Sequence, residues 1–132
     1  MADRAYGILL DTSAIIAHLR RRIDIFSLTS RNEPLFLPLV VLGELYKGVE
    51  KSNRPGHNRR LVDEFLEMAG VLYPEITTAV SYGKIAVALE RTGKTMPEND
   101  VWIAAVALEC DMPLATLNAH FDRVKGLTVI HW

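Results

Sequence analysis

The chain has 132 residues, which is enough for one hydrophobic core but too few for two, so we expect a single domain over residues 1–132. Hydrophobic residues make up 49% of the chain, charged residues make up 23%, and the net charge is -1, which indicates a folded protein without an overall attraction to nucleic acid. The sequence has no apolar run approaching the ~18 residues of a membrane span, no apolar signal region at its N-terminus and only one cysteine, Cys110, so we expect a cytoplasmic protein with no disulfide and no membrane contact.

Strands and helices are predicted to alternate along the chain. The first element is a buried strand at 6–11, because the short apolar run YGILLD is bounded by turn-type residues and suits a sheet that is covered on both faces. A later helix is expected to end at Gly93, a residue type common at helix C-termini. In chain order, the remaining predicted elements are a helix at 14–21, a weak helix at 23–30, a strand at 34–41, a helix through 42–49, a helix at 58–69, a strand at 70–75, helices at 77–92 and 95–110, and strands at 112–118 and 127–132.

Local residue choice predicts where several of these elements begin and end. Thr12 or Ser13 is expected to cap the first helix, since a hydroxyl oxygen accepts a bond from a free backbone N–H of the first turn. The stretch SNRPGHN at 52–58 is predicted to be a loop, because Asn, Pro and Gly break both helical and strand patterns. Thr95 and Glu98 stand three residues apart, as in a capping box, and are expected to open the last helix.

The alternation of strands and helices is typical of an α/β domain with a mainly parallel sheet. Such a sheet is covered by helices on both faces. In open sheets of this kind, ligands bind beyond the carboxyl ends of the strands, near the point where the strand order reverses. Asp11, at the end of the first predicted strand, is therefore placed where this architecture performs its chemistry.

Three acidic side chains stand in apolar surroundings at the ends of different predicted elements. Asp11 lies between GILL and TSAII, Glu44 lies in LPLVVLGELYKG, and Asp100 continues the apolar face of the last helix. Each has an alternative explanation that needs no function: Asp11 as a helix cap, and Glu44 and Asp100 as first-turn acids stabilised by the helix dipole. Considered together, the three carboxylates are expected to converge at one edge of the sheet.

Three carboxylates at one edge would repel one another unless a divalent cation lay among them. Oxygen ligands suit Mg²⁺ or Mn²⁺, which keep several waters and contact substrate phosphates directly. We therefore expect a Mg²⁺ or Mn²⁺ site held by Asp11, Glu44 and Asp100. Zinc is not expected, because there is one cysteine and the histidines form no pair at ligand spacing; they are His18, His57, His120 and His131.

Four short motifs, taken in order, resemble those of PIN-domain ribonucleases, specifically the VapC-type toxins of toxin–antitoxin pairs. The motifs run from residue 8 to the C-terminus and read ILLDTSAII, VVLGELYKGVE, PENDVWIAAVALE and LATLNAHFDRVKGLTVIHW. The resemblance implies a single PIN-like α/β/α sandwich with a central sheet of about five strands, and Mg²⁺- or Mn²⁺-dependent endonuclease activity on RNA. It also implies a homodimer and inhibition by a VapB-like antitoxin whose tail enters the active-site groove.

The same resemblance assigns site residues by position. Asp11, Glu44 and Asp100 match the family's three central acids. The fourth acidic position falls on Asn118, a neutral oxygen ligand that adds no charge, so the resemblance does not decide between one and two metal ions. Thr116 matches a hydroxyl that lies close to the metal in relatives. The implied reaction is metal-assisted hydrolysis of an RNA phosphodiester bond by a water that attacks in line.

Basic residues follow Glu44 in the sequence, and this basic cluster is expected to follow an RNA backbone. A solvated surface is the alternative explanation. Tyr46 and Trp102 could stack on RNA bases, although packing in the core or in a dimer is the expected role of both rings. Asp122 is expected on a solvated turn outside the site. The basic cluster consists of Lys47, Lys51, Arg54, Arg59 and Arg60.

Three other functions fit parts of the pattern. A Mg²⁺ phosphohydrolase with an aspartyl nucleophile usually has a second Asp two residues after the first, and Ser13 stands there instead. A non-catalytic binding module that kept the fold and lost its metal is favoured by Asn118 and opposed by the three intact acids. Assembly with an antitoxin into a repressor is the third, and the sequence does not weigh it against catalysis.

Overall fold

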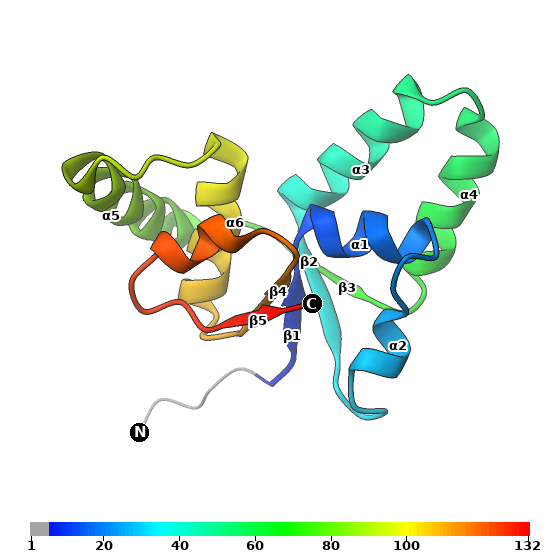
Figure 1. The fold of residues 1–132 in the computed structure, drawn as a ribbon, viewed down its shortest axis with the longest axis horizontal. Coiled ribbons are helices and arrows are strands. Elements are labelled where there is room, and N and C mark those ends of the chain that lie inside the picture. The colour runs from blue at the N-terminus through cyan, green and yellow to red at the C-terminus, as the bar shows by residue number, and fades with distance from the viewer. Residues whose placement is uncertain (1–5) are drawn as a thin grey trace.

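Five parallel strands form the central sheet of the computed structural model, which describes residues 6–132 (Figure 1). The strands are β1 (Ile8–Leu10), β2 (Leu35–Pro38), β3 (Gly70–Leu72), β4 (Leu114–Thr116) and β5 (Val129–His131). Their order in the sheet is β3-β2-β1-β4-β5. The predicted parallel sheet is confirmed, while the first five residues of the domain predicted over 1–132 lie outside the described part of the chain.

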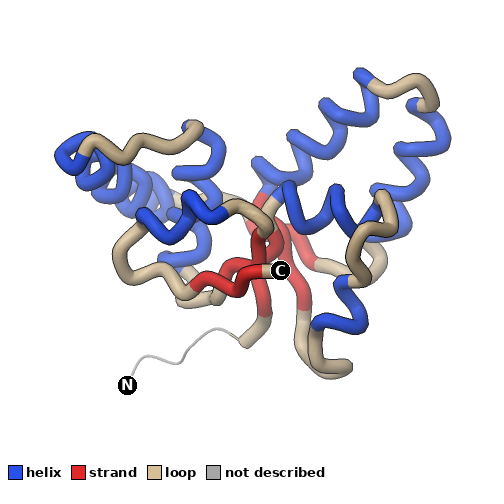
Figure 2. The backbone as a smooth tube through the Cα atoms, in the orientation of Figure 1, coloured by secondary structure: helices blue, strands red, loops and turns tan. Residues whose placement is uncertain are grey.

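Helices cover both faces of this sheet. They are α1 (Thr12–Leu19), α2 (Ile25–Leu28), α3 (Leu39–Lys51), α4 (Pro55–Phe65), α5 (Ile76–Thr92), α6 (Glu98–Glu109) and the short 3-10 helix η1 (Ala119–Arg123). Figure 1 shows α5 and α6 on one side of the sheet and α1 to α4 on the other, and Figure 2 shows the strands between the two groups. The predicted α/β/α sandwich is therefore confirmed. Within residues 6–132, no helix combines the length and the apolar character that crossing a membrane requires.

The middle strand, β1, lies at the centre of the core. Ile8, Leu9 and Leu10 are all buried, and Leu9 pairs in register with Phe36 of β2 and with Leu114 of β4. A strand needs an uninterrupted apolar run when both faces of its sheet are covered, because neither set of alternating side chains meets water. This requirement explains why such an apolar segment forms a strand here.

The order of the strands reverses between β1 and β4. From β1 the chain moves outward through β2 to β3, and it then returns to place β4 on the other side of β1, with β5 beyond it. The carboxyl ends of β1 and β4 are therefore neighbours, at the kind of switch point where open α/β sheets bind their ligands. Asp11 directly follows β1, and Asn118 follows β4 closely.

Local chemistry explains where the helices begin and end, both where the boundaries match the prediction and where they differ from it. α4 begins at Pro55, earlier than predicted, because proline is pre-organised for the first position of a helix and its missing N–H costs nothing there. Thr95 and Glu98 form no capping box: Pro97 precedes α6, and no side chain caps that helix. α5 ends at Gly93 as predicted, with the left-handed φ of 66° that glycine adopts readily.

Replacing Leu9 with alanine should lower the free energy of unfolding by about 2–5 kcal/mol, because the change leaves a cavity beside the middle strand. Equilibrium unfolding in urea, followed by circular dichroism, measures this loss. Leu28→Ala is the matched control, since Leu28 is 50% exposed and its loss should stay within about 0.5 kcal/mol. Equal losses in the two variants would contradict the central position of β1.

Candidate functional site

A pocket of about 530 Å³ opens at the carboxyl ends of β1 and β4. Its lining includes the three predicted acids, Asp11, Glu44 and Asp100, and it also includes Asn118. Asp11 follows β1, Glu44 lies in α3, and Asp100 lies in the first turn of α6. Segments that are far apart in the sequence therefore meet here, and the three acids share one pocket.

Asp11 is deeply buried, with 1% of its surface exposed. Its carboxylate accepts hydrogen bonds from the Ala14 backbone N–H at 2.9 Å, from Ser13 Oγ at 2.7 Å and from Thr116 Oγ1 at 2.5 Å. The bond from Ala14 makes Asp11 the N-cap of α1, so the prediction that Thr12 or Ser13 caps this helix is wrong. A carboxylate is a stronger acceptor than a hydroxyl, and the Ser13 hydroxyl instead donates to it.

The surroundings of Asp11 disfavour its charged form. Burial raises the pKa of the Asp11 carboxyl above its ordinary value, and the hydrogen bonds from Thr116, Ala14 and Ser13 oppose that rise. Capping accounts for the bond from Ala14 alone. It does not account for the bond from Thr116, which reaches Asp11 from β4.

Glu44 lies in the second turn of α3 rather than in the first turn as predicted, because that helix begins at Leu39, directly after β2. The helix dipole acts mainly on the first turn, so it does not explain the position of Glu44. Thr12 Oγ1 donates to Glu44 Oε1 at 2.7 Å, which links α1 to α3. Lys47, the nearest cation in the sequence, forms no ion pair within residues 6–132.

Asp100 lies on the same face of α6 as the buried residue Ile103. His120 Nε2 lies 2.7 Å from Asp100 Oδ2. Burial raises the pKa of Asp100, the neighbouring His120 lowers it, and the negative charges of Glu44 and Asp11 raise it further. The three acids therefore interact electrostatically, as the convergence of their charges requires.

His120 is a site residue that the sequence analysis missed. It lies in η1, directly after β4, and its partner is an aspartate on another helix. His120 is not found by looking for pairs of histidines at metal-ligand spacing, because its partner is Asp100. The available signal was its position two residues after Asn118, in a segment expected to leave the sheet at the same edge as the acids.

The other predicted residues differ in their distance from the pocket. Asn118 lines it, and the Asn118 backbone N–H donates to Thr116 Oγ1 at 2.9 Å. Thr116 is fully buried and contacts Asp11. Asp122 is exposed in η1 and lies 2.9 Å from His131 Nε2, outside the pocket lining. It is solvated, as predicted.

The side chains at this pocket fit Mg²⁺ or Mn²⁺ in their chemistry. The three carboxylates and the Asn118 amide supply hard oxygen donors, which these ions prefer to nitrogen and sulfur. Within residues 6–132, no three or more His, Cys, Asp or Glu side chains are already spaced to hold a metal ion. A Mg²⁺ site usually needs only one or two carboxylates together with several waters.

The two aromatic rings considered for base stacking are both engaged within the chain. Tyr46 Oη donates to Asp63 at 2.7 Å, and the Arg59 guanidinium lies 5.0 Å from the centre of the Tyr46 ring. Trp102 stacks on Tyr82 with ring centres 4.1 Å apart. These contacts fit the packing role expected for both rings.

The basic cluster lies on α3, on α4 and on the loop between them, which form a helical hairpin beside the sheet (Figure 1). Arg59 is partly committed, since it lies 3.6 Å from Asp63. The other four members are exposed and form no ion pair within the described residues: Lys47, Lys51, Arg54 and Arg60. Because α3 also carries Glu44, these charges lie on the helical hairpin that contributes to the pocket.

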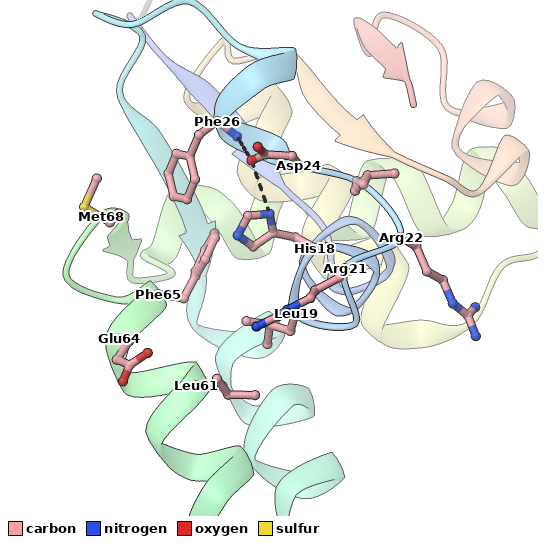
Figure 3. Close-up of a pocket in the computed structure, with 11 residues that line it drawn as sticks. His18, Leu19, Arg21, Arg22, Asp24, Phe26, Leu61, Glu64, Phe65 and Met68 are labelled. Atoms are coloured by element: carbon pink, nitrogen blue, oxygen red, sulfur yellow. Dashed lines mark hydrogen bonds and ion pairs between the residues drawn. The ribbon is translucent and has the colours of Figure 1, made fainter.

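A second hollow, of about 650 Å³, lies between α1, α2 and α4 (Figure 3). The rings of His18, Phe26 and Phe65 contact one another along its wall. His18 Nδ1 accepts a hydrogen bond from the Ile25 backbone N–H at 3.1 Å; burial lowers the pKa of His18, and nearby Asp24 raises it. None of the predicted site residues lines this hollow, so it is separate from the candidate active site.

Comparison with known proteins gives a PIN domain family model that matches residues 8–127. The chain is 32% identical over 127 residues to Ribonuclease VapC2 from Haemophilus influenzae, covering 94% of this chain and 96% of the relative. It is 30% identical over 132 residues to tRNA(fMet)-specific endonuclease VapC from Salmonella typhimurium, covering 94% of this chain and 96% of the relative.

The same similarity appears among solved structures. The crystal structure of VapBC2 from Rickettsia felis, bound to a DNA fragment from their promoter, superimposes with a TM-score of 0.88. The matched chain is 26% identical in sequence, and the match covers 95% of this chain and 98% of the other. The likeness therefore extends over nearly the whole of both chains.

Replacing Asp11 with asparagine should raise the free energy of unfolding by about 1 kcal/mol. Burial raises the pKa of Asp11 in the folded state, so the charge lowers stability at pH values above that raised pKa. Asparagine removes the charge and caps helices as well as aspartate does. The gain should shrink as the pH falls through the raised pKa toward the ordinary value of 3.8, which thermal unfolding at several pH values measures.

Asp122→Asn is the control for this comparison, because Asp122 is exposed and its replacement should leave the melting temperature nearly unchanged. If Asp11→Asn instead lowers the melting temperature at neutral pH, the hydrogen bonds to the carboxylate outweigh the cost of its burial.

Proposed function

Because the chain belongs to the PIN domain family, we propose that it is an endoribonuclease toxin of the VapC type. In this role it hydrolyses phosphodiester bonds of RNA and is neutralised by a VapB-like antitoxin. The observation that carries the proposal is that Asp11, Glu44 and Asp100 line one pocket at the carboxyl ends of β1 and β4. Similarity to VapC ribonucleases over nearly the whole chain supports the same activity.

Mg²⁺ or Mn²⁺ is the proposed cofactor. The chemistry that such a cation supplies when bound is charge neutralisation at the scissile phosphate and a lower pKa for water. Asp11 and Asp100 would hold the cation, with Glu44 as the third acid. Ser13 and Thr116 keep the Asp11 carboxylate fixed through hydrogen bonds to its oxygens.

The polar side chains around the pocket would orient the reacting groups. Thr12 holds Glu44 Oε1 at 2.7 Å, so the direction of that carboxylate is set before substrate arrives. Asn118 offers an uncharged amide to the substrate or to a water. Burial raises the pKa of Asp11 and of Asp100, and a bound cation would offset this rise and keep both carboxylates ionised.

The RNA backbone is proposed to lie along the helical hairpin of α3 and α4. Four exposed basic side chains on this hairpin have no ion-pair partner within residues 6–132, so they are available to phosphates. Glu44 lies on the same helix as Lys47 and Lys51. A strand held by these lysines would therefore pass close to the acids.

Exposed apolar surface supports a homodimer and an antitoxin complex. Ile76, which is 85% exposed, lies with Val80 and Val87 on one outward face of α5. The hollow of Figure 3 adds the exposed side chains of Phe26 and Met68. Apolar patches of this kind mark protein interaction sites. The likeness to VapBC2 bound to promoter DNA supports repressor assembly as a further role.

A non-catalytic binding module is the second candidate function. Asn118 in place of a fourth acid favours it, whereas the shared pocket of the three acids favours catalysis. A phosphohydrolase with an aspartyl nucleophile has less support, because Ser13 stands where its second Asp is needed.

Asp11→Asn and Asp100→Asn should each lower RNA cleavage by about 100-fold or more, because each removes a charge that holds the cation. Cleavage of total RNA by protein cleared of contaminating nuclease, with the new ends mapped, measures the loss. Asp122→Asn is the matched control, since it removes a carboxylate outside the pocket. Retained activity in both pocket variants would overturn the ribonuclease proposal.

The same assay tests the cofactor. Chelation of divalent cations should abolish cleavage by the unmodified chain, and added Mg²⁺ or Mn²⁺ should restore it. Full activity in the presence of chelator would overturn the cofactor proposal while leaving the ribonuclease proposal standing.

Removing the charges of Lys47 and Lys51 together should weaken RNA binding and flatten its salt dependence. The slope of log K against log salt should fall by about 1.4, because each phosphate contact on a single strand contributes about 0.7. Fluorescence anisotropy with labelled RNA at several salt concentrations measures the slope. The control removes equal charge elsewhere, at Lys84 of α5 and Lys125 before β5. An unchanged slope in Lys47→Ala/Lys51→Ala would show that the hairpin is only a solvated surface.

A further inference from the structure

His120 approaches the candidate active site from η1. Its Nε2 atom lies 2.7 Å from Asp100 Oδ2, and the side chains of His120 and Asp100 are 24% and 16% exposed. A carboxylate oxygen carries no proton when ionised, so a polar contact this short is favourable only when Nε2 carries the ring hydrogen. The contact is not aligned as a hydrogen bond, and His120 Nε2 has no hydrogen-bond partner within the described residues, so the pairing is electrostatic. Asp100 is therefore its principal polar neighbour.

The surrounding structure holds the His120 ring in place. Phe121, the next residue, is fully buried, and its ring centre lies 4.9 Å from that of His120. Arg123 Nη1 donates to the Thr95 backbone carbonyl at 2.9 Å, which joins η1 to the segment just before α6. This contact ties η1, which carries His120, to the segment that leads into α6, which carries Asp100. The pairing is a built feature of the fold rather than a chance approach of two mobile side chains.

Only one oxygen of Asp100 is engaged by this contact. His120 approaches Oδ2, and this contact leaves Oδ1 unengaged. A carboxylate that is held at one oxygen presents the other in a defined direction, and Asp100 lines the pocket shared by the acids. Partners of this kind behind metal-ligating carboxylates orient the ligand and strengthen metal binding.

We propose that His120 is a positioning residue, which holds Asp100 Oδ2 so that Oδ1 is directed to a divalent cation in the pocket. This inference rests on the proposed function. It adds a histidine to the polar side chains of the site, one that acts through Asp100 and that lies two residues beyond Asn118, where the fourth acid of the family is absent. The proposal does not extend to the other histidine–aspartate contact, between His131 and Asp122. That contact is exposed and lies outside the pocket.

Mn²⁺ titration calorimetry on the full chain tests the proposal. His120→Ala should weaken Mn²⁺ binding by about 10-fold or more, in the range seen when a carboxylate or histidine partner behind a metal ligand is removed. His120→Gln should restore most of the affinity, because the amide N–H₂ can lie beside Asp100 Oδ2 as the imidazole N–H does. His131→Ala is the matched control, since it breaks a contact of similar length, 2.9 Å, outside the pocket and should leave the affinity unchanged.

The outcomes separate this inference from the proposed function. Asp100→Asn in the same titration shows which part of the heat of Mn²⁺ binding depends on the Asp100 carboxylate. If Asp100-dependent binding is present and His120→Ala binds Mn²⁺ within twofold of the unmodified chain, or more tightly, the positioning role is overturned while the cofactor proposal stands. If the unmodified chain shows no Asp100-dependent heat, both fail. Near-ultraviolet circular dichroism checks folding, and His120→Asn, whose shorter amide does not reach Asp100, replaces His120→Ala if the latter does not fold.

Discussion

The rest of the structure depends on one buried carboxylate, that of Asp11. It ends the middle strand, caps α1 through the Ala14 N–H, and accepts a bond from Thr116 of the neighbouring strand β4. A buried charge without partners costs several kcal/mol, so these donors are a condition of placing an acid at this point. The same contacts fix α1 and β4 relative to β1. The acid that opens the site is thus also the one that organises the centre of the fold.

Much of the architecture follows from local apolar patterns. The run before Asp11 suits only a strand covered on both faces, and the alternation of such runs with helical periods leaves few arrangements other than a parallel sheet. Helix boundaries are less predictable from sequence, because they depend on competition between neighbouring groups. At Asp11 the carboxylate accepts the bond that Thr12 or Ser13 was expected to accept, and at Pro55 a residue that usually ends a helix begins one.

The functional site, like the helix boundaries, can be predicted from the sequence only in part. Topology brings the ends of β1 and β4 together, so the meeting of Asp11 with Thr116 and Asn118 can be inferred from strand order. The pairing of His120 with Asp100 cannot, because it depends on the path of η1 after the sheet and on its attachment to Thr95. The family motifs are defined by their acids, and a histidine that contacts one of these acids is not part of the motifs.

The two edges of the sheet, β3 and β5, have three residues each. An exposed edge is a template on which a strand of another molecule can form hydrogen bonds, and a short edge offers few free backbone groups for such pairing. Growth of fibrils by successive strand addition is disfavoured by this geometry. Contacts with other molecules are therefore left to the helical surfaces, where side-chain shape rather than backbone pairing selects the partner.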